Sequence, residues 1–346
     1  MTVSARDMAN AIRALSMDAV EAAKSGHVGL PLGMADAATV LFSKFMKHNP
    51  SDPDWADRDR FVLSAGHGSM LVYSLLHLTG YESVSRDDIR NFRQLGRPTA
   101  GHPENFLTKG VETTTGPLGQ GITTAVGMAM AERHLNARFG DELVNHKTYV
   151  IAGDGCLMEG ISQEAITLAG HLKLSNLIVL FDDNAVTIDG GTDMADSTDQ
   201  CMRFEASGWV TRKVDGHDAV DVEAALAWAQ DQDKPVMLAV KTIIGYGANR
   251  AGTGPAHGGP YGEEEVATVR ENIGWPHAPF EVPAEIETAW LDAGKRAHAE
   301  HMAWKNRLDN HAGNLVTLFG KTAAHRIQVI KWQGQGKVST GRRHPG

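Results

Sequence analysis

Residues 147–155 read Lys147-Thr-Tyr-Val-Ile-Ala-Gly-Asp-Gly155, a β-branched, apolar run that ends in a carboxylate between two glycines. Such a run is typical of a buried strand, and the glycines after it allow a tight turn that can approach a phosphate. Residues 158–172 carry apolar side chains at helical spacing: Ile161, Ala165, Leu168 and Leu172. A second apolar run, Asn176-Leu-Ile-Val-Leu-Phe181, precedes Asp182-Asp183-Asn184. This order predicts a strand–helix–strand unit.

Asp154 and Asn184 follow the two predicted strands. Because the strands of such a unit are parallel, both residues are expected at the carboxyl edge of the sheet, where open α/β sheets bind ligands. A carboxylate and an amide oxygen suit a hard divalent cation, Mg²⁺ or else Ca²⁺ or Mn²⁺, with diphosphate oxygens and water as its other ligands. The predicted fold class is α/β, a doubly wound, mostly parallel sheet with helices on both faces. Gly-Asp-Gly by itself is also common in plain surface turns.

Four histidines lie in separate loops and have glycine beside them: Ser25-Gly26-His27-Val28-Gly29, Ala65-Gly66-His67-Gly68-Ser69, Ala100-Gly101-His102-Pro103-Glu104 and Ala256-His257-Gly258-Gly259. Imidazoles can move protons and bind hydroxyl groups near neutral pH, and glycine leaves room for a ligand beside them. Other histidines among polar or helical residues are predicted to be solvated: His48, His134, His146, His298 and His301. His77 and His171 lie in apolar runs and are predicted to be packed in the core.

These segments together resemble transketolase, from about Ala9 to about Asn310. The resemblance includes Leu30-Pro-Leu-Gly-Met34, Phe61-Val-Leu-Ser64, Gly101-His-Pro-Glu104, Thr113-Thr-Thr-Gly-Pro-Leu-Gly-Gln-Gly121, Gly153-Asp-Gly-Cys-Leu-Met-Glu-Gly160 and Thr242-Ile-Ile-Gly-Tyr-Gly247. It implies a thiamine-diphosphate-binding fold with thiamine diphosphate and a divalent cation as cofactors. One departure is Val28, where the family usually has proline; contact through His27 is still expected.

The resemblance also implies roles for individual residues. Asp154, Asn184 and the backbone carbonyl of Val186 would hold the metal. The cofactor would be lined by His67, Gly116, Pro117, Leu118, Asp154, Gly155, Glu159, Asn184 and His257. The sugar substrate would contact His27, His102 and His257, and His27 and His257 would assist proton movements. Glu159 and Glu164 would lie at a dimer interface.

The chain is about half the length that is usual in the family, and only the diphosphate-binding domain is recognised, so it is expected to carry half of each active site. The implied reaction is transfer of a two-carbon ketol unit from a ketose phosphate to an aldose phosphate, as a homodimer or as a heterotetramer with a C-terminal transketolase subunit. The alternatives are a truncated, inactive cofactor-binding fragment and a component of a dihydroxyacetone synthase-like enzyme. 1-Deoxyxylulose-5-phosphate synthase and 2-oxo-acid dehydrogenase E1 components share the metal motif, and the set of His27, His102 and Thr113–Gly121 favours transketolase or dihydroxyacetone synthase over them.

Composition and segment patterns complete the expectations. A formal charge of −9 argues against a nucleic-acid partner, no apolar run is long enough for a membrane span, and two cysteines without a zinc pattern fit a reducing cytoplasm. Residues 1–282 are expected to form the diphosphate domain and 283–311 a helical segment. Residues 312–346 form a basic tail without family resemblance, with six Lys or Arg and no acid. A shifted reading frame or a truncation is favoured as its origin over a basic interaction tail. The glycine-rich run Gly245–Gly262 around His257 is predicted to be a flap.

Overall fold

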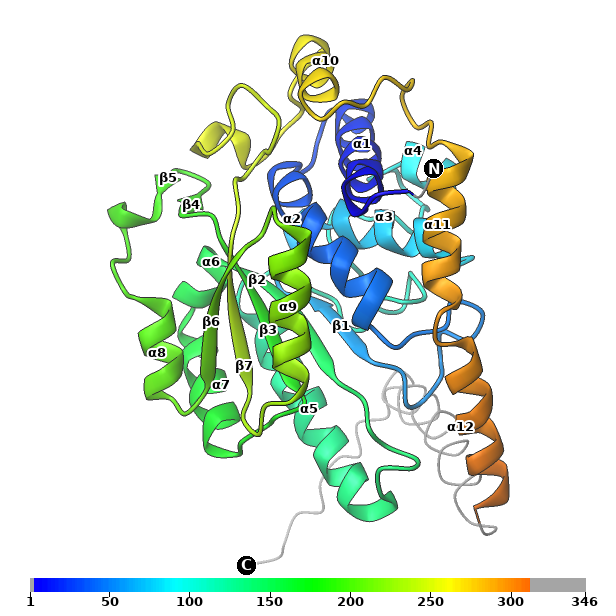
Figure 1. Cartoon of the computed structure of the whole chain (residues 1–346). Coiled ribbons are helices and arrows are strands. Elements are labelled where there is room, and N and C mark those ends of the chain that lie inside the picture. Colours follow the sequence, from blue (N-terminus) through cyan, green and yellow to red (C-terminus); the bar gives the residue numbers. More distant parts are fainter. Residues whose placement is uncertain (1–2, 312–346) are drawn as a thin grey trace, which may run out of the picture. The chain divides into compact units, whose positions relative to one another are not determined.

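The computed structural model describes residues 3–311. Its main sheet has five strands, all parallel, in the order β1-β2-β3-β7-β6 (Figure 1). The strands are β1 Arg60–Leu63, β2 Thr148–Gly153, β3 Leu177–Asp183, β6 Val210–Asp215 and β7 Val236–Lys241. β2 and β3 are buried except at their carboxyl ends, as continuous apolar runs in a covered parallel sheet should be. The predicted strand–helix–strand unit and the parallel α/β fold are confirmed.

Helices cover both faces of this sheet. β2 leads through α7, Gly160–His171, to β3, whereas β6 leads through α9, Ala219–Gln230, back toward β7 in the opposite direction along the sheet. Because crossovers between parallel strands are right-handed, α7 and α9 lie on opposite faces (Figure 1). The remaining helices of the sheet domain are α1 Ala5–Ala23, α2 Gly29–Val40, α3 Met70–Thr79, α4 Arg86–Arg90, α5 Gln120–Phe139, α6 Asp154–Met158, α8 Gln200–Ala206, α10 Glu263–Asn272 and α11 Ala284–Lys295.

The packed face of α7 differs from the one that the apolar spacing predicted. Small residues and Ile166 are buried instead: Ser162, Ala165, Ile166, Ala169 and Gly170. Ile161, Leu168 and Leu172 remain 37–43% exposed. The helix packs against its neighbours through residues short enough for close approach, and Trp209 Nε1 donates a hydrogen bond to the Ile166 carbonyl at 2.8 Å. The larger apolar side chains therefore form an exposed stripe.

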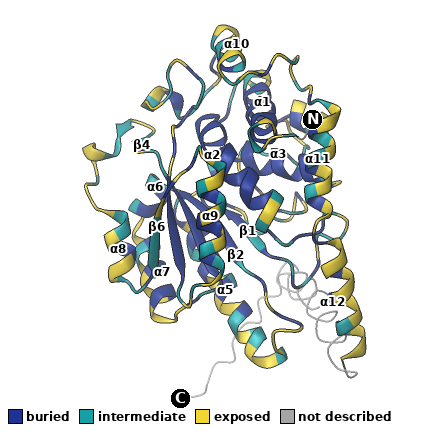
Figure 2. Ribbon diagram, viewed as in Figure 1, coloured by how far each residue is buried: buried dark blue, intermediate teal, exposed yellow. Residues whose placement is uncertain are grey.

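Helix α1 is surrounded by protein over most of its length. Every residue from Met8 to Val20 is buried, as the dark-blue ribbon of α1 in Figure 2 shows. The helix begins with a capping box between Ser4 and Asp7, and it ends at Lys24 in a left-handed conformation with φ 49°. Its buried polar side chains must consequently find partners inside the protein.

The C-terminal helices belong to two compact units. The first unit ends at His298 and includes α11, whose Trp290 donates a hydrogen bond to the Met8 carbonyl at 3.1 Å. The second unit begins at Ala299 and contains most of α12, His298–Asn310. The predicted basic tail, 312–346, lies outside the described residues. Among residues 3–311, each helix is too short or too polar to cross a membrane.

Several histidines are placed differently from the prediction. His48, His146 and His301 are buried rather than solvated, whereas His171 is exposed rather than packed. His48 Nδ1 lies 3.1 Å from the Met46 carbonyl and its ring stacks on Tyr81. His146 Nδ1 lies 3.1 Å from an oxygen of Asp57. The partner of His146, and the Tyr81 ring on which His48 stacks, both lie far away in the sequence, so local composition does not reveal that these two rings are buried.

Two glycines of α5 offer a matched test of packing. A Cβ on Gly121 would lie 2.4 Å from the Ser64 Cα, whereas a Cβ on the exposed Gly127 would meet nothing within 4 Å. We expect Gly121→Ala to lower the free energy of unfolding by about 1–3 kcal/mol through overpacking. Gly127→Ala should raise it by about 0.5–1 kcal/mol, because alanine has the better helix propensity. Denaturant unfolding of both variants measures this, and equal effects would contradict the packing of α5 on β1.

Candidate functional site

The carboxyl edge of the sheet brings together the turns after β2 and β3. Gly153 pairs in register with Asp182, so Asp154 and the segment Asp182–Val186 leave the sheet side by side. A hydrogen bond from the Ala185 backbone reaches the Asp154 carboxylate directly. Ala185 has φ 59°, a left-handed conformation that costs free energy in a residue other than glycine and is concentrated at functional sites.

A pocket of about 840 Å³ opens at this edge. Most of the predicted site residues line it: His27, His67, His102, Gly116, Leu118, Asp154, Gly155, Asn184, Val186 and His257. Pro117 and Glu159 are not among its lining residues. The sequence reasoning did not assign the other lining residues: Leu30, Gly153, Cys156, Asp182, Thr187, Ile188 and Ile244. Of these, only Asp182 had a visible signal, since it opens the acidic run before Asn184.

The donor atoms around Asp154 fit a divalent cation. Asp154 Oδ2 is buried and has no hydrogen-bond partner. Burial, and then the negative charges of Asp182 and Asp183, raise the Asp154 pKa to about 7. A buried oxygen without a partner, in a site that disfavours its negative charge, is what a cation would complete. Within the described residues no group of three or more His, Cys, Asp or Glu is arranged so that it could hold a metal ion, and the predicted donor set does not require one.

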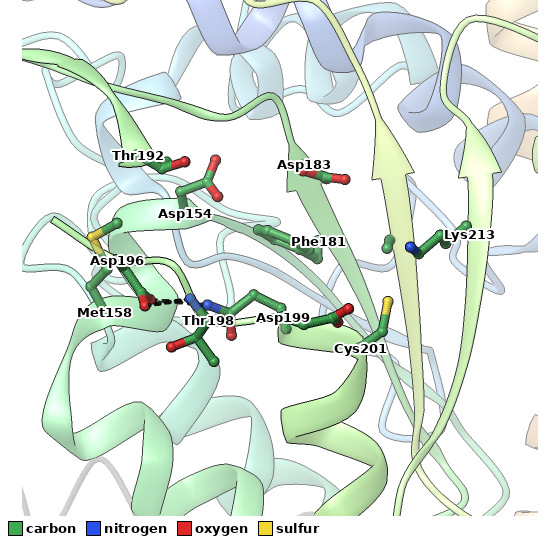
Figure 3. Close-up of a pocket in the computed structure, with 12 residues that line it drawn as sticks. Asp154, Met158, Phe181, Asp183, Thr192, Asp196, Thr198, Asp199, Cys201 and Lys213 are labelled. Atoms are coloured by element: carbon green, nitrogen blue, oxygen red, sulfur yellow. Dashed lines mark hydrogen bonds between the residues drawn. The ribbon is translucent and has the colours of Figure 1, made fainter. Parts of the chain in front are cut away.

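The small antiparallel pair β4, Val186–Thr187, and β5, Gly190–Gly191, follows the Asn184 turn. Asp154 also lines a second, more polar pocket of about 620 Å³. Figure 3 shows the Asp154 and Asp183 carboxylates in this pocket, with Cys201 and Lys213 across it. Asp154 therefore lines both pockets.

Three histidines form a compact group in the larger pocket. His67 lies in the turn Gly66–Gly68, His27 between α1 and α2, and His257 after the turn Gly254–Ala256. The ring centroids of His67 and His257 are 4.8 Å apart. The ring centroid of His27 lies 5.1 Å from that of His67 and 5.4 Å from that of His257. Nδ1 of His27 and Nδ1 of His257 are buried without partners. These nitrogens are therefore available to a ligand.

The predicted flap is tied to the His27 loop by backbone hydrogen bonds. Gly245 N–H donates to the Gly29 carbonyl at 3.0 Å, and Gly259 N–H donates to the Gly26 carbonyl at 2.7 Å. Gly29 permits this approach, because a Cβ there would lie 2.3 Å from the Ala256 carbonyl oxygen. The run 245–262 is therefore bonded to the segment Gly26–Gly29 from both sides of His257.

The grouped imidazoles are expected to be uncharged at neutral pH. Burial, reinforced by the charges of the neighbouring imidazoles, lowers the pKa of His67 to about 3 and that of His27 to about 4. Because burial disfavours the imidazolium form, these rings should take up protons only when the pH falls to these values. We expect the Hε1 NMR resonances of His27 and His67 to stay in place between pH 8 and pH 5 in the cofactor-free chain. Movement with a midpoint near the ordinary histidine pKa of about 6.5 would contradict this.

A parallel α/β sheet with a carboxylate, an amide and glycine turns at its carboxyl edge defines a diphosphate-binding domain. Comparison with known proteins specifies which one. The family model for the transketolase thiamine diphosphate binding domain matches residues 4–327, and the chain belongs to this family. The match runs past residue 311, into the segment set apart above as a basic tail, and the predicted domain boundaries stay a prediction.

The relatives are transketolases of about twice this length. Transketolase from Cereibacter sphaeroides is 59% identical over 302 residues, which cover 87% of this chain and 46% of the relative. Transketolase 1 from Escherichia coli (strain K12) is 56% identical over 315 residues, 89% of this chain and 47% of the relative. The structure of transketolase from Campylobacter jejuni superposes with a TM-score of 0.87 at 43% identity, over 90% of this chain and 49% of that one. The chain therefore spans about half the length of these relatives.

Proposed function

We propose that this domain binds thiamine diphosphate through a divalent cation held by Asp154, Asn184 and the Val186 carbonyl. The observation that carries the proposal is the buried Asp154 Oδ2, which lacks a hydrogen-bond partner beside the Asn184–Val186 turn. Mg²⁺ suits these oxygen donors, and Ca²⁺ or Mn²⁺ could replace it. Gly116, Leu118 and Gly155 line the pocket and would contact the cofactor. Pro117 and Glu159 were also predicted to contact the cofactor, but they do not line the pocket.

We further propose that the assembled enzyme transfers a two-carbon ketol unit from a ketose phosphate to an aldose phosphate. Bound thiamine diphosphate supplies the nucleophilic carbon and the electron sink for cleaving a bond next to a carbonyl. His27, His102 and His257 line the same pocket and would bind the sugar hydroxyls. His27 and His257, with free Nδ1 atoms, would accept and return protons of those hydroxyls.

The function is tested by reconstitution. The purified chain would be assayed for ketol transfer from xylulose 5-phosphate to ribose 5-phosphate, alone and with the C-terminal half of a transketolase relative. We expect turnover only in the combined sample, because the matched relatives are about twice as long as this chain. Equal turnover by the chain alone would overturn the half-site proposal, and no turnover in either sample would count against ketol transfer.

We also propose a cytoplasmic location. Cys156 and Cys201 are both free thiols, which suits a reducing compartment.

We propose a second copy of the chain as one partner, either in a homodimer or in a heterotetramer. The exposed stripe of Ile161, Leu168 and Leu172 on α7 supports this, because contiguous apolar surface marks association sites. Glu159 and Glu164 are exposed on the same stretch of chain, as a predicted interface requires. Sedimentation of the chain and of Leu168→Glu tests it: the wild type should be dimeric and the variant shifted toward monomer.

His27→Ala and His257→Ala should slow the reconstituted enzyme by about 10²-fold or more, in keeping with an acid–base role. Both residues lie in loops, so the free energy of unfolding should change by no more than about 1 kcal/mol. Steady-state rates and denaturant unfolding measure the two effects. His134→Ala is the control, because His134 is exposed and lies outside the pocket. Normal turnover or failure to fold would contradict the assignment.

A further inference from the structure

We propose that Asp182 is a positioning residue that sets which end of the Asn184 amide faces the cation, an inference that rests on the proposed cation site. Asp182 is 1% exposed, at the carboxyl end of β3, and no role was assigned to it above. Its Oδ2 accepts a hydrogen bond from Asn184 Nδ2 at 2.9 Å. Its Oδ1 accepts another from the Thr242 hydroxyl, at the end of β7.

The orientation of the amide matters because only its oxygen can bind a cation. An asparagine amide has an acceptor end and a donor end of nearly equal shape, so its neighbours decide which way it points. An ionised carboxylate offers acceptors only, and an amide oxygen placed 2.9 Å from it would be repelled. Asp182 therefore draws the NH₂ end of Asn184 inward with a charge-assisted hydrogen bond.

The other end of Asn184 is consequently turned toward Val186. Asn184 Oδ1 accepts the Val186 backbone N–H at 2.9 Å, which closes the turn that also presents the Val186 carbonyl. An amide oxygen has two lone pairs, so one remains for a cation after this bond. If the amide flipped, its NH₂ group would face both the Val186 N–H and the cation, and both contacts would be repulsive.

Asp182 is fixed in place by the sheet rather than by the loop it orients. It pairs in register with Gly153 of β2 and Val240 of β7, and Asp154 follows Gly153 directly. The cation ligands therefore take their relative positions from three adjacent strands. Mutation of a residue that hydrogen-bonds to a metal ligand typically weakens metal binding by about 10–100-fold.

The test measures Mn²⁺ binding to the full chain by electron paramagnetic resonance at pH 8, with thiamine diphosphate present. We expect Asp182→Ala to weaken Mn²⁺ binding by about 10–100-fold. Asp182→Asn should stay within a few-fold of wild type, because its amide oxygen can still accept from Asn184 while the Thr242 hydroxyl reverses its role. Thr242→Val removes the other bond to Asp182 and should also leave Mn²⁺ binding nearly unchanged. If Asp182 acted only by anchoring Thr242, this variant would lose affinity as Asp182→Ala does, and the proposal would be overturned.

A double-mutant cycle separates orientation from general damage. Once Asn184 is alanine, Asp182→Ala should have almost no further effect on Mn²⁺ affinity, and independent, additive losses would overturn the proposal. If Asp154→Ala and Asn184→Ala themselves leave Mn²⁺ binding unchanged, the proposed cation site is wrong. If those two weaken binding while Asp182→Ala does not, only the role of Asp182 is wrong.

The wild-type chain decides the question if Asp182→Ala does not fold. The side-chain NH₂ signals of Asn184, identified by their loss in Asn184→Ala, should exchange with solvent at least about 10-fold more slowly than those of an exposed asparagine. Exchange as fast as that of an exposed side chain would show that Asp182 does not hold the amide.

Discussion

Asp154→Ala is expected to abolish cation-dependent binding of thiamine diphosphate, with a loss of affinity of at least about 100-fold. It removes the only anionic side chain assigned to the cation, and the cation links the diphosphate to the protein. Calorimetric titration of the cofactor, with and without Mg²⁺, measures the loss. Unchanged affinity in the variant would mean that the cation lies elsewhere.

The same substitution should have the opposite effect on the cofactor-free chain. Burial and two neighbouring carboxylates raise the pKa of Asp154 to about 7, so its negative charge is unfavourable where it stands. Asp154→Ala is therefore expected to leave the melting temperature of the cofactor-free chain unchanged or raised, while the upward shift on adding Mg²⁺ and cofactor disappears. Asp183→Asn is the matched control, since it removes a nearby charge but not a proposed ligand. It should keep cofactor binding, and its failure to do so would indicate that total charge, rather than Asp154, holds the cation.

The sheet and its ligand-binding edge could be predicted because their determinants are local. β2 and β3 are covered on both faces, so each appears as an unbroken apolar run, and the polar residues that follow each run must emerge at the same edge. Asp154 and Asn184 were therefore placed together from the chain pattern alone.

The histidine group could not be placed by local reasoning. His27, His67 and His257 lie on three loops, and the His27 and His257 loops are joined by backbone hydrogen bonds, such as Gly259 N–H to the Gly26 carbonyl. Backbone groups are the same in every residue, so these contacts leave no signal in residue types, and the grouping was expected only from the family resemblance. The packed face of α7 was missed for a related reason. More than one face of this helix carries apolar residues, and contacts with the rest of the protein determine which face is buried.

A largely buried charged network that joins α1 and α2 was also invisible in the sequence. Arg13 of α1 is fully buried, and its Nη2 lies 2.5 Å from Asp36 Oδ2 of α2. Asp36 also accepts from Arg6 at 3.0 Å and lies 3.0 Å from His217 Nδ1. Burial alone would raise the pKa of Asp36, but the hydrogen bond from His217 and the positive charge of Arg13 outweigh burial and hold it below its ordinary value.

This network contacts the first residues of the loop 243–262, which carries His257. His217 Nε2 accepts the Ile243 backbone N–H at 3.0 Å, so His217 bridges Asp36 and the start of the loop. The ring of Tyr246 stacks on His217 and lies against the Arg13 guanidinium. Loss of Asp36 should therefore loosen residues 243–262 as well as destabilise the fold.

Asp36→Ala is expected to lower the free energy of unfolding at pH 7 by about 3–5 kcal/mol, because it leaves the Arg13 guanidinium buried without its counter-charge. The pKa of Asp36 is lower in the folded chain than in the unfolded chain, so its carboxylate stabilises the fold when the pH is above the unfolded pKa of about 3.9. This stabilisation is lost as the pH falls, so the difference in free energy of unfolding between wild type and variant should shrink below about pH 4. Denaturant unfolding at pH 7 and pH 3.5 measures both effects, and hydrogen exchange should rise in 243–262. Glu223→Ala is the control: it breaks an ion pair with Lys44 in which both side chains are 44–46% exposed, and it should cost no more than about 1 kcal/mol.

A double mutant tests whether the charge of Asp36 is responsible. Adding Asp36→Ala to Arg13→Met should lower the free energy of unfolding by less than Asp36→Ala does alone, because no buried cation is then left without its counter-charge. Equal costs in the two backgrounds would show that Asp36 stabilises the fold by packing rather than by its charge.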